Sequence, residues 1–257
     1  MRVNVITVSF NSSKTIADTC ISVKLQVGCH IEHLVIDGGS TDGTQDIAAK
    51  AIRSGGRIFS EPDRGIYDAM NKGLRHSTCD IVGFLNSDDL FHDQNVIARI
   101  SEVFSDPAVD AVFGDLVYVS RFDPTRIVRY WDSSTFNSSA FSYGVMPPHP
   151  TLYVRGNVLR RFGGFRLDLP MANDFEFCAR YIASHRVRYR HMPHTLVKMR
   201  LGGESNRSLR NIALQNFCIF RALRLNGIIP HPLYPLAKAL DKGRQFIRRP
   251  PATAQIS

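Results

Sequence analysis

Two adjacent carboxylates, Asp88 and Asp89, follow the apolar run at residues 81–85 after only two residues, Asn86 and Ser87. A short apolar run predicts a buried strand, so both acids should lie at the edge of a sheet, where ligands of open α/β sheets bind. Carboxylates this close repel each other unless a cation or hydrogen-bond donors compensate. Mg²⁺ or Mn²⁺ would compensate through oxygen ligation and could also hold diphosphate oxygens. The alternative is a solvated acidic turn that caps the next helix.

A second acidic segment, residues 37–43, is rich in glycine and follows another expected strand. Such a loop could cradle a phosphate, yet it has neither the G-x-G-x-x-G spacing nor the Gly-Lys-Ser/Thr of a P-loop. The alternative is a tight turn in which Thr41 or Asp42 caps the following helix. The segment alone does not decide between the two.

Alternating elements must position both segments. Strands are expected at residues 3–10, 33–36, 57–60, 80–85 and 108–113, and helices at residues 14–26, 44–53, 64–76 and 96–104. This alternation predicts an α/β fold with a Rossmann-like, mostly parallel sheet and helices on both faces.

Beyond these elements the pattern changes. Residues 116–155 indicate antiparallel strands and long loops, and a helical patch follows near 174–184. Residues 209–225 have the periodicity of an amphipathic helix, with Phe217, Phe220 and Leu223 expected in the core.

The charge of the chain is unevenly distributed. Its 257 residues include 32 Lys+Arg and 23 Asp+Glu, a net charge of +9. This size and composition permit a packed core and exclude a disordered chain or a disulfide mini-scaffold. Residues 1–199 carry a net charge of only +1, so nearly all the excess belongs to residues 200–257. A nucleic-acid-binding protein with basic residues throughout its fold is therefore disfavoured, and we expect no nucleic-acid partner.

The cysteines and the N-terminus bear on the compartment. No two of the five cysteines have a C-x-x-C spacing, which predicts free thiols in a reducing cytoplasm. The N-terminus lacks the apolar region of a signal peptide, and no apolar stretch approaches the roughly 18 residues of a transmembrane helix. We expect a cytoplasmic protein.

Seven blocks of sequence, taken together, resemble a known family; they lie at residues 6–11, 35–44, 60–73, 83–89, 163–165, 173–175 and 201–205. Their order resembles that of family 2 glycosyltransferases with a GT-A fold, above all the bacterial branch that builds exopolysaccharides such as colanic acid, and glycolipid sugars. Each block alone is unspecific, but the ordered set covers the chain from residue 3 to residue 205. The resemblance implies an inverting enzyme that moves a sugar from a nucleotide-diphosphate donor to a hydroxyl of a glycan or lipid-linked acceptor.

The same resemblance divides the chain into two parts. Residues 1–205 would form the GT-A domain, with a nucleotide-sugar half at about 1–115 and an acceptor half at about 116–205. Residues 206–257 would form a C-terminal amphipathic helix and a basic tail.

The resemblance also implies roles for the acidic pair. Asp88 would contact the nucleotide ribose, and Asp88 and Asp89 would form the metal site, where Mg²⁺ or Mn²⁺ bridges the diphosphate. Asn86 stands where many members of the family have an aspartate, so this metal site has one carboxylate fewer.

The nucleobase would lie near the ends of the first two strands. Phe10 and Asn11 match positions that contact the base, and Asp37 matches the first acid of a frequent Asp-Asp pair. The second acid, which commonly reads the base, is replaced by Gly38. Specificity for uracil therefore does not carry over, and thymidine or guanosine donors remain open.

Further residues match the block that lines the nucleotide cleft. Asp63 would contact base or ribose, and Arg64 and Lys72 would contact phosphate. Gly202 and Gly203 match a loop that often closes over the diphosphate. For Arg64 and Lys72 the alternative is a capped surface helix with solvated charges.

Asp174 would be the general base that deprotonates the acceptor hydroxyl, although Asn173 replaces the glutamate of the family's Glu-Asp motif. The alternative is that Asp174 is the N-cap of the following helix. Glu176 is the nearest competing acid and could instead face solvent. His149 lies in a block that often faces the acceptor, though a lone histidine is more often structural.

The C-terminal tail combines apolar and basic residues. Helical spacing places Leu233, Leu236, Leu240 and Ile247 roughly on one side, among several lysines and arginines. This pattern suits an anionic membrane surface, and a solvated or disordered tail is the alternative.

Two other functions remain open besides nucleic-acid binding. A nucleotidyltransferase on a related fold should carry a glycine-rich, basic loop after the first strand, which residues 11–14 do not supply. A catalytically silent homologue is conceivable because Asn86 and Asn173 both replace acids.

Overall fold

The computed structural model describes residues 1–202 and 209–250. Among these, the strands of a single mixed sheet are β1 (Arg2–Ser9), β2 (His30–Asp37), β3 (Arg57–Ser60), β4 (Ile81–Phe84), β5 (Leu90–Phe91), β6 (Ala111–Val119), β7 (Ile127–Trp131), β8 (Tyr153–Arg155) and β9 (Tyr189–Arg200). The helices are α1 (Ile16–Lys24), α2 (Thr44–Ala51), α3 (Ile66–His76), α4 (Val96–Val103), α5 (Gly156–Phe162), α6 (Asn173–Cys178), α7 (Leu209–Leu225) and α8 (Tyr234–Ile247). Two short 3₁₀ helices, η1 (Ser138–Tyr143) and η2 (His149–Thr151), precede β8, and a π-helical turn, η3 (Ala179–Ser184), continues α6.

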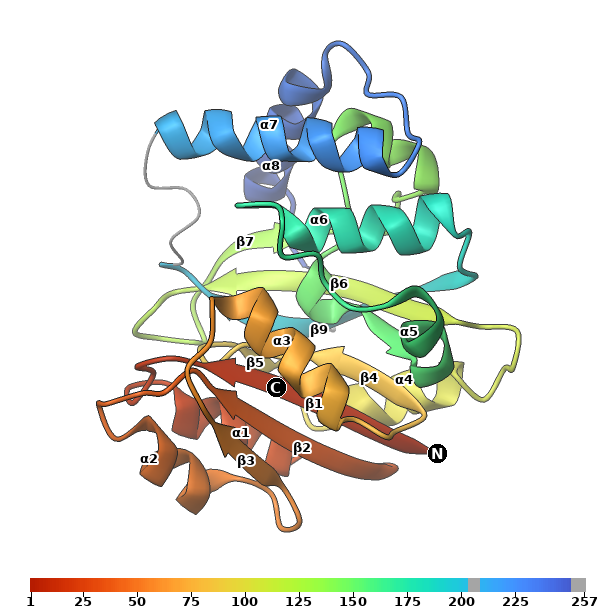
Figure 1. Ribbon diagram of the computed structural model, residues 1–257. Coiled ribbons are helices and arrows are strands. Elements are labelled where there is room, and N and C mark those ends of the chain that lie inside the picture. Colours follow the sequence, from red (N-terminus) through yellow and green to blue (C-terminus); the bar gives the residue numbers. More distant parts are fainter. Residues whose placement is uncertain (203–208, 251–257) are drawn as a thin grey trace.

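The N-terminal half of the sheet is parallel. β1 pairs with β2 and with β4, and β2 pairs with β3, all in the parallel sense. β1 is apolar almost throughout because both of its faces are covered: Ile6 and Val8 pack toward α3, whereas Val3 and Val5 pack toward α1 and α4. Figure 1 shows α3 crossing one face of these strands. The expected α/β fold with helices on both faces is confirmed.

The C-terminal half of the sheet mixes directions. β6 pairs antiparallel with β7 and β8, as the pattern at 116–155 predicts, and parallel with β9. β9 was not predicted from the sequence. Its pairing with β6 shifts register between Gly114 and Asp115. Gly114 pairs with Met192, but Asp115 pairs with Thr195, so two residues of β9 are skipped. The skipped residues include Pro193, which cannot donate to a ladder, so the bulge breaks the alternation that marks a strand.

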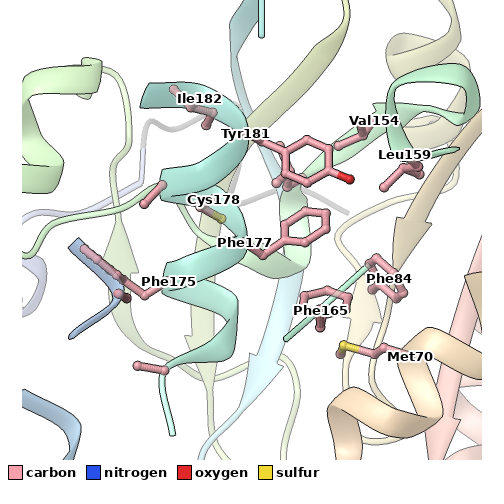
Figure 2. Close-up of a cluster of buried hydrophobic side chains, with 14 of the residues drawn as sticks. Met70, Phe84, Val154, Leu159, Phe165, Phe175, Phe177, Cys178, Tyr181 and Ile182 are labelled. Carbon is pink, nitrogen blue, oxygen red and sulfur yellow. The ribbon is translucent and has the colours of Figure 1, made fainter. Parts of the chain in front are cut away.

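An aromatic cluster fixes α6 against the sheet. The ring of Phe177 stacks on Phe165 and on Tyr181, with centroid distances of 4.4 and 4.2 Å. Phe165 in turn contacts Phe84 at the end of β4. Figure 2 shows these side chains converging between α6 and the sheet. The start of α6 is therefore held at a defined place relative to the end of β4.

Helix α7 forms as predicted but buries a different face. Phe217 and Phe220 were expected in the core, and this expectation is wrong: their side chains are 61% and 46% exposed. The buried residues are Cys218, Ile219 and others on the opposite side of the helix, which packs on α6. Because α7 has apolar residues on both sides, its periodicity identifies a helix without identifying the buried face.

Two expectations about the chain as a whole can be compared with the structure. All five cysteines are free thiols, as predicted, and four of them are buried. Within the described residues, no helix is long and apolar enough to cross a membrane.

A buried histidine gives the fold a pH dependence. The His33 ring on β2 is hydrogen-bonded to the Thr7 hydroxyl at 2.9 Å, and burial lowers its pKa to about 3. The unfolded chain takes up this proton near pH 6.5, so the stability associated with neutral His33 is complete above that pH and is lost as pH falls toward 3. We expect the melting temperature of His33→Gln to vary less between pH 6.5 and 5 than that of the wild type. Equal pH slopes in thermal unfolding would contradict this.

Candidate active site

The carboxyl ends of four parallel strands meet at one edge of the sheet. Ser9 at the end of β1 is in register with Asp37 of β2, and Asp37 is in register with Ser60 of β3. The segments that follow these strands and β4 therefore emerge side by side. The segments with Asn11, Asp63 and Asp88 follow β1, β3 and β4, and Asp37 ends β2, so these four residues lie at this edge.

Asp88 and Asp89 form a crowded acidic pair beyond β4. Asp89 is fully buried and Asp88 is half-buried. Burial raises the pKa of both carboxyls, and the charge of Asp88 raises the pKa of Asp89 further. Asn86 donates to Asp89 Oδ2 at 3.3 Å, while its own Oδ1 is buried with no hydrogen-bond partner among the described residues. Three oxygen-bearing side chains thus gather where burial disfavours the ionised carboxylates, an arrangement that fits a hard divalent cation.

Basic groups lie beside this pair. The Arg200 backbone N–H donates to Asp89 at 3.3 Å, and the Arg200 guanidinium donates to the Asp88 carbonyl and pairs with Asp18. The positive charges of Arg200 and Arg121 both lower the pKa of Asp88, against the rise caused by burial. Gly202 lies against Arg121. Gly203 lies outside the described residues.

Asp37 organises a loop. Its carboxylate accepts hydrogen bonds from Ser9, Gln45 and Ser60 and from the backbone and side chain of Ser40. Burial opposes its ionisation, but these hydrogen bonds lower its pKa overall. Because Asp37 has no exposed surface, the geometry does not favour the expected nucleotide contact. The segment 37–43 is a tight turn built around this buried carboxylate.

Phe10 and Asn11 stand at the end of β1 as expected. Phe10 is 63% exposed, and Asn11, with a left-handed φ of 47°, accepts a hydrogen bond from the Thr41 backbone N–H at 3.1 Å. A positive φ is uncommon outside glycine, and such strain often marks functional sites. Both side chains border the same edge as the acidic pair.

Asp63 occupies the space that a side chain at position 38 would fill. A Cβ added to Gly38 would overlap the Asp63 carboxylate. Asp63 Oδ1 accepts a hydrogen bond from the Gly65 N–H at 2.8 Å, and Oδ2 faces Gly38. A carboxylate is therefore present beside Gly38, supplied by the segment after β3.

The two cations of this block have different surroundings. The Lys72 ammonium is buried; it donates to the Pro62 carbonyl at 2.7 Å and pairs with Glu61 at 3.0 Å. Arg64 is exposed at the start of α3, next to Asp68. Lys72 thus holds the 61–63 segment in place, and Arg64 is the cation accessible to a ligand.

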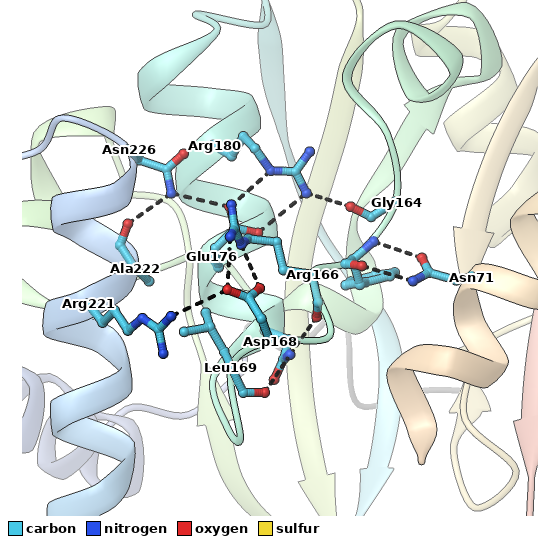
Figure 3. Close-up of polar contacts among 12 residues, drawn as sticks. Asn71, Gly164, Arg166, Asp168, Leu169, Glu176, Arg180, Arg221, Ala222 and Asn226 are labelled. Atoms are coloured by element: carbon cyan, nitrogen blue, oxygen red, sulfur yellow. Dashed lines mark hydrogen bonds and ion pairs between the residues drawn. The ribbon is translucent and has the colours of Figure 1, made fainter. Parts of the chain in front are cut away.

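Asp174 lies in the first turn of α6, half-buried. The helix begins at Asn173, so Asp174 is not its N-cap; that position is Ala172, with a left-handed φ of 60°. Glu176, the competing acid, does not face solvent. It is 1% exposed, forms an ion pair with Arg180 at 3.0 Å and accepts a hydrogen bond from Asn226 (Figure 3). Glu176 is therefore engaged in packing α6, which leaves Asp174 as the available acid.

The charge of Asp174 acts on side chains from three other elements. Burial raises the pKa of Tyr67 on α3, and the Asp174 charge adds to the rise. Burial lowers the pKa of His149 on η2. Burial also lowers the pKa of Lys238 on α8, to about 8. The negative charge of Asp174 opposes both shifts. The Nε2 of His149 is buried and lacks a hydrogen-bond partner in the part of the chain that the structure describes.

The pKa of Tyr118 on β6 responds to the charges of both acidic groups. Burial raises its pKa, the Arg129 guanidinium stacked 3.6 Å from its ring lowers it, and the carboxylates of Asp89 and Asp174 both raise it. The Phe84–Phe165–Phe177 contacts hold the start of α6 against the end of β4, so Asp174 and the acidic pair follow elements that pack together. We treat them as one candidate site.

Comparison with known proteins identifies the family. Residues 4–165 match the model for glycosyl transferase family 2. The chain belongs to this family. It is 34% identical over 183 residues to an uncharacterized glycosyltransferase of Mycobacterium tuberculosis, covering 69% of this chain and 68% of that protein. It is 28% identical over 191 residues to a PGL/p-HBAD biosynthesis glycosyltransferase of Mycobacterium bovis, covering 72% of each.

Solved structures show the GT-A-like fold. A mannosyltransferase of Pyrobaculum calidifontis, in complex with GDP-Man and Mn²⁺, superposes with a TM-score of 0.62 at 23% identity, over 93% of this chain and 68% of that one. TarS 1–349 of S. aureus, in complex with UDP, superposes with a TM-score of 0.64 at 18% identity, over 88% of this chain and 65% of that one. The chain spans 39% of the longer TarS chain.

For this family 2 glycosyltransferase, sequence reasoning missed several residues near the site. Tyr67, Tyr118, Arg121 and Lys238 come from α3, β6, the turn after β6, and α8. Each is an ordinary residue in its local sequence, and the motifs contain no signal for Tyr118, Arg121 or Lys238.

Membership of the family sets aside the nucleotidyltransferase and nucleic-acid-binding alternatives.

Proposed function

We propose that this glycosyltransferase moves a sugar from a nucleotide-diphosphate donor to a hydroxyl of a glycan or lipid-linked acceptor, with inversion at the anomeric carbon. The observation that carries the proposal is the packing of α6, with Asp174 in its first turn, against the end of β4, beyond which the Asp88–Asp89 pair lies. Residues 1–205 form the catalytic domain in this proposal, and α7 and α8 belong to the C-terminal extension. The enzyme would act in the cytoplasm, peripherally on the inner face of the membrane.

The acidic pair would hold Mg²⁺ or Mn²⁺. Asp88, Asp89 and the unpartnered Oδ1 of Asn86 are the ligands available, and water and diphosphate oxygens would complete the coordination. A bound cation stabilises the negative charge that develops on the leaving diphosphate. Arg121 and Arg200, which influence Asp88 electrostatically, would meet the same charge.

Asp174 would accept the proton of the acceptor hydroxyl. The acceptor oxygen forms its bond to the anomeric carbon while the bond from that carbon to the diphosphate oxygen breaks, so no covalent enzyme intermediate is needed. Tyr67 and His149, which neighbour Asp174, would orient the base and the acceptor. General-base assistance of this kind contributes roughly 10²–10⁴-fold in rate.

The donor would be bound between Phe10, Asn11, Asp63 and Arg64 on one side and Asp88 and Gly202 on the other. The related structures are complexes with UDP, UDP-GlcNAc and GDP-Man, so these are the first donors to test. The relative in PGL/p-HBAD biosynthesis supports a glycolipid acceptor. Membership of the exopolysaccharide branch is the alternative.

A screen of nucleotide-sugars tests this function. UDP-, GDP- and TDP-sugars are compared for protection against thermal unfolding and for hydrolysis, with and without Mn²⁺. The proposal expects Mn²⁺-dependent protection by one nucleotide class, and slow hydrolysis of its sugar. Protection without hydrolysis, and without transfer to any lipid or glycan fraction, would instead favour a catalytically silent homologue.

We expect Asp63 to take the place of the base-reading acid that is missing at position 38. In Asp63→Asn, the Oδ1 that accepts from Gly65 is retained, but an amide N–H₂ replaces the Oδ2 that faces Gly38. A hydrogen-bond donor of the base or ribose would then face the N–H₂ of the amide, which is itself a hydrogen-bond donor. The affinity for the nucleotide should therefore fall about tenfold. Titration calorimetry with the nucleotide found in the screen measures this.

Asp46→Asn is the matched control for this prediction, because Asp46 is an exposed acid on α2. Its nucleotide affinity should equal that of the wild type. Unchanged affinity in Asp63→Asn would remove Asp63 from the donor site.

A further inference from the structure

Helix α8 has two contrasting faces. Its inner face is anchored to the protein: Tyr234 and Gln245 are buried, and the Lys238 ammonium donates to Gln215 of α7 at 2.7 Å. Its outer face carries Leu236, Leu240 and others, each more than half exposed. An amphipathic helix normally buries its leucines, so this helix presents to solvent the face that it would be expected to bury.

Helix α7 adds aromatic residues to the same end of the molecule. Phe217 and Phe220 are exposed on the side of α7 opposite its contact with α6. The Tyr234 hydroxyl donates to the Asn216 carbonyl at 2.8 Å, so α8 crosses α7 next to Phe217. Figure 1 shows α7 and α8 together at one end of the molecule, remote from β1, β2 and β3. We call the exposed residues Phe217, Phe220, Leu233, Leu236, Leu240 and Ile247 the cap surface.

The charge of the segment that carries the cap surface is mostly positive, although Arg221 and Arg248 pair with Asp168 and Asp132 of other elements. Residues 209–250 contain eight Lys and Arg and a single acid, Asp241. On α7, Arg221 and Arg224 are exposed near the phenylalanines, and on α8, Lys242 and Arg244 are exposed beside the leucines. Leucine, phenylalanine and basic side chains together are what binding to an anionic lipid interface requires.

The charge also discriminates among possible occupants. A second copy of the chain, packed on the same surface, would bring two sets of cations together. A protein partner would need an acidic, apolar surface of matching shape. A bilayer with anionic headgroups needs no matched shape, since exposed apolar side chains enter the interface while basic side chains meet the headgroups.

We propose that the cap surface docks this enzyme onto an anionic lipid bilayer. The proposal deepens the proposed function, on which its catalytic meaning rests, by stating how a lipid-linked acceptor would reach the site. Lys238 on the inner face of α8 lies close enough to Asp174 to be influenced by its charge. Docking through the outer face of α8 would therefore bring the acceptor side of the active site near the membrane.

Vesicle cosedimentation tests the proposal without any catalytic readout. The wild type is mixed with vesicles of phosphatidylcholine alone or with added phosphatidylglycerol. We expect binding to the anionic vesicles, weakened by high salt because exposed charges are screened. The double variant Leu236→Ser, Leu240→Ser should bind them at least about tenfold more weakly, because two exposed apolar side chains are lost from the interface.

Matched controls separate docking from folding and from donor binding. Leu25 and Val27, after α1, are 59% and 47% exposed and lie far from α8 in sequence, so Leu25→Ser, Val27→Ser should bind like the wild type. Melting temperature and protection by the donor nucleotide should be unchanged in both double variants. If no nucleotide protects the wild type against unfolding, the proposed function is contradicted. Vesicle binding is measured independently, so that result would not decide the docking proposal.

Three outcomes would overturn the docking proposal. The first is a wild type that does not sediment with anionic vesicles. The second is equal vesicle binding by the wild type and the Leu236→Ser, Leu240→Ser variant. The third is a dimer in sedimentation velocity that these two substitutions dissociate, because the occupant would then be a second copy of the chain.

Discussion

Replacement of Asp174 by asparagine is expected to lower the transfer rate by roughly 10²–10⁴-fold, the usual contribution of a general base. The substitution keeps the shape of the side chain and the Oδ1 that accepts from the Phe175 N–H at 2.8 Å. It removes only the ability to accept a proton from the acceptor hydroxyl. Steady-state transfer with the donor found in the screen measures the effect, and the loss should lie in kcat, with donor affinity unchanged.

Asp168→Asn provides the matched control for the base. Asp168 is an exposed acid of the same half of the chain, paired with Arg166 and Arg221 (Figure 3). Its replacement should leave the transfer rate within about twofold, since an exposed ion pair contributes little to stability. A full rate in Asp174→Asn would remove Asp174 as the base. A loss of rate together with a large fall in melting temperature would point instead to damage at the start of α6.

The placement of the acidic pair could be predicted because it depends on local sequence. Residues 81–85 form an apolar run that is long enough for a strand and too short for a core helix, and Asp88 and Asp89 follow it within four residues. Parallel strands then bring the ends of β1, β2 and β4 to one edge without further information. The same reasoning placed Asp37 at the end of its strand, whereas Asp63 was singled out only by the family resemblance.

The partners of those residues could not be predicted, because they depend on packing between distant segments. Asp37 is occupied by donors from β1, α2 and β3, which no motif encodes. Arg121 approaches Asp88 only because β6 lies next to β9. That pairing was missed, since the bulge at Pro193 hides the strand. The exposed face of α7 likewise follows from which side of the helix meets α6.

Replacement of Asp89 by asparagine is expected to have opposite effects on metal response and on stability. Burial and the charge of Asp88 raise the pKa of Asp89, so its ionised form is disfavoured in the folded protein without a cation. The neutral variant should therefore melt at an equal or higher temperature in the absence of metal. With one carboxylate fewer, it should lose most of the Mn²⁺-induced rise in melting temperature, and its Mn²⁺-dependent rate should fall roughly 10²-fold or more.

The opposite signs make this result hard to mimic by misfolding. A damaged fold would lower the melting temperature with and without Mn²⁺, whereas loss of a metal ligand affects only the Mn²⁺ response. Asp93→Asn is the control, because Asp93 follows the same acidic segment but is paired with Arg99. That pairing holds the pKa of Asp93 low against the effect of burial, so its neutral form should destabilise the protein and leave the Mn²⁺ response intact. An Asp89→Asn enzyme with undiminished Mn²⁺-dependent activity would show that the cation binds elsewhere or is not required.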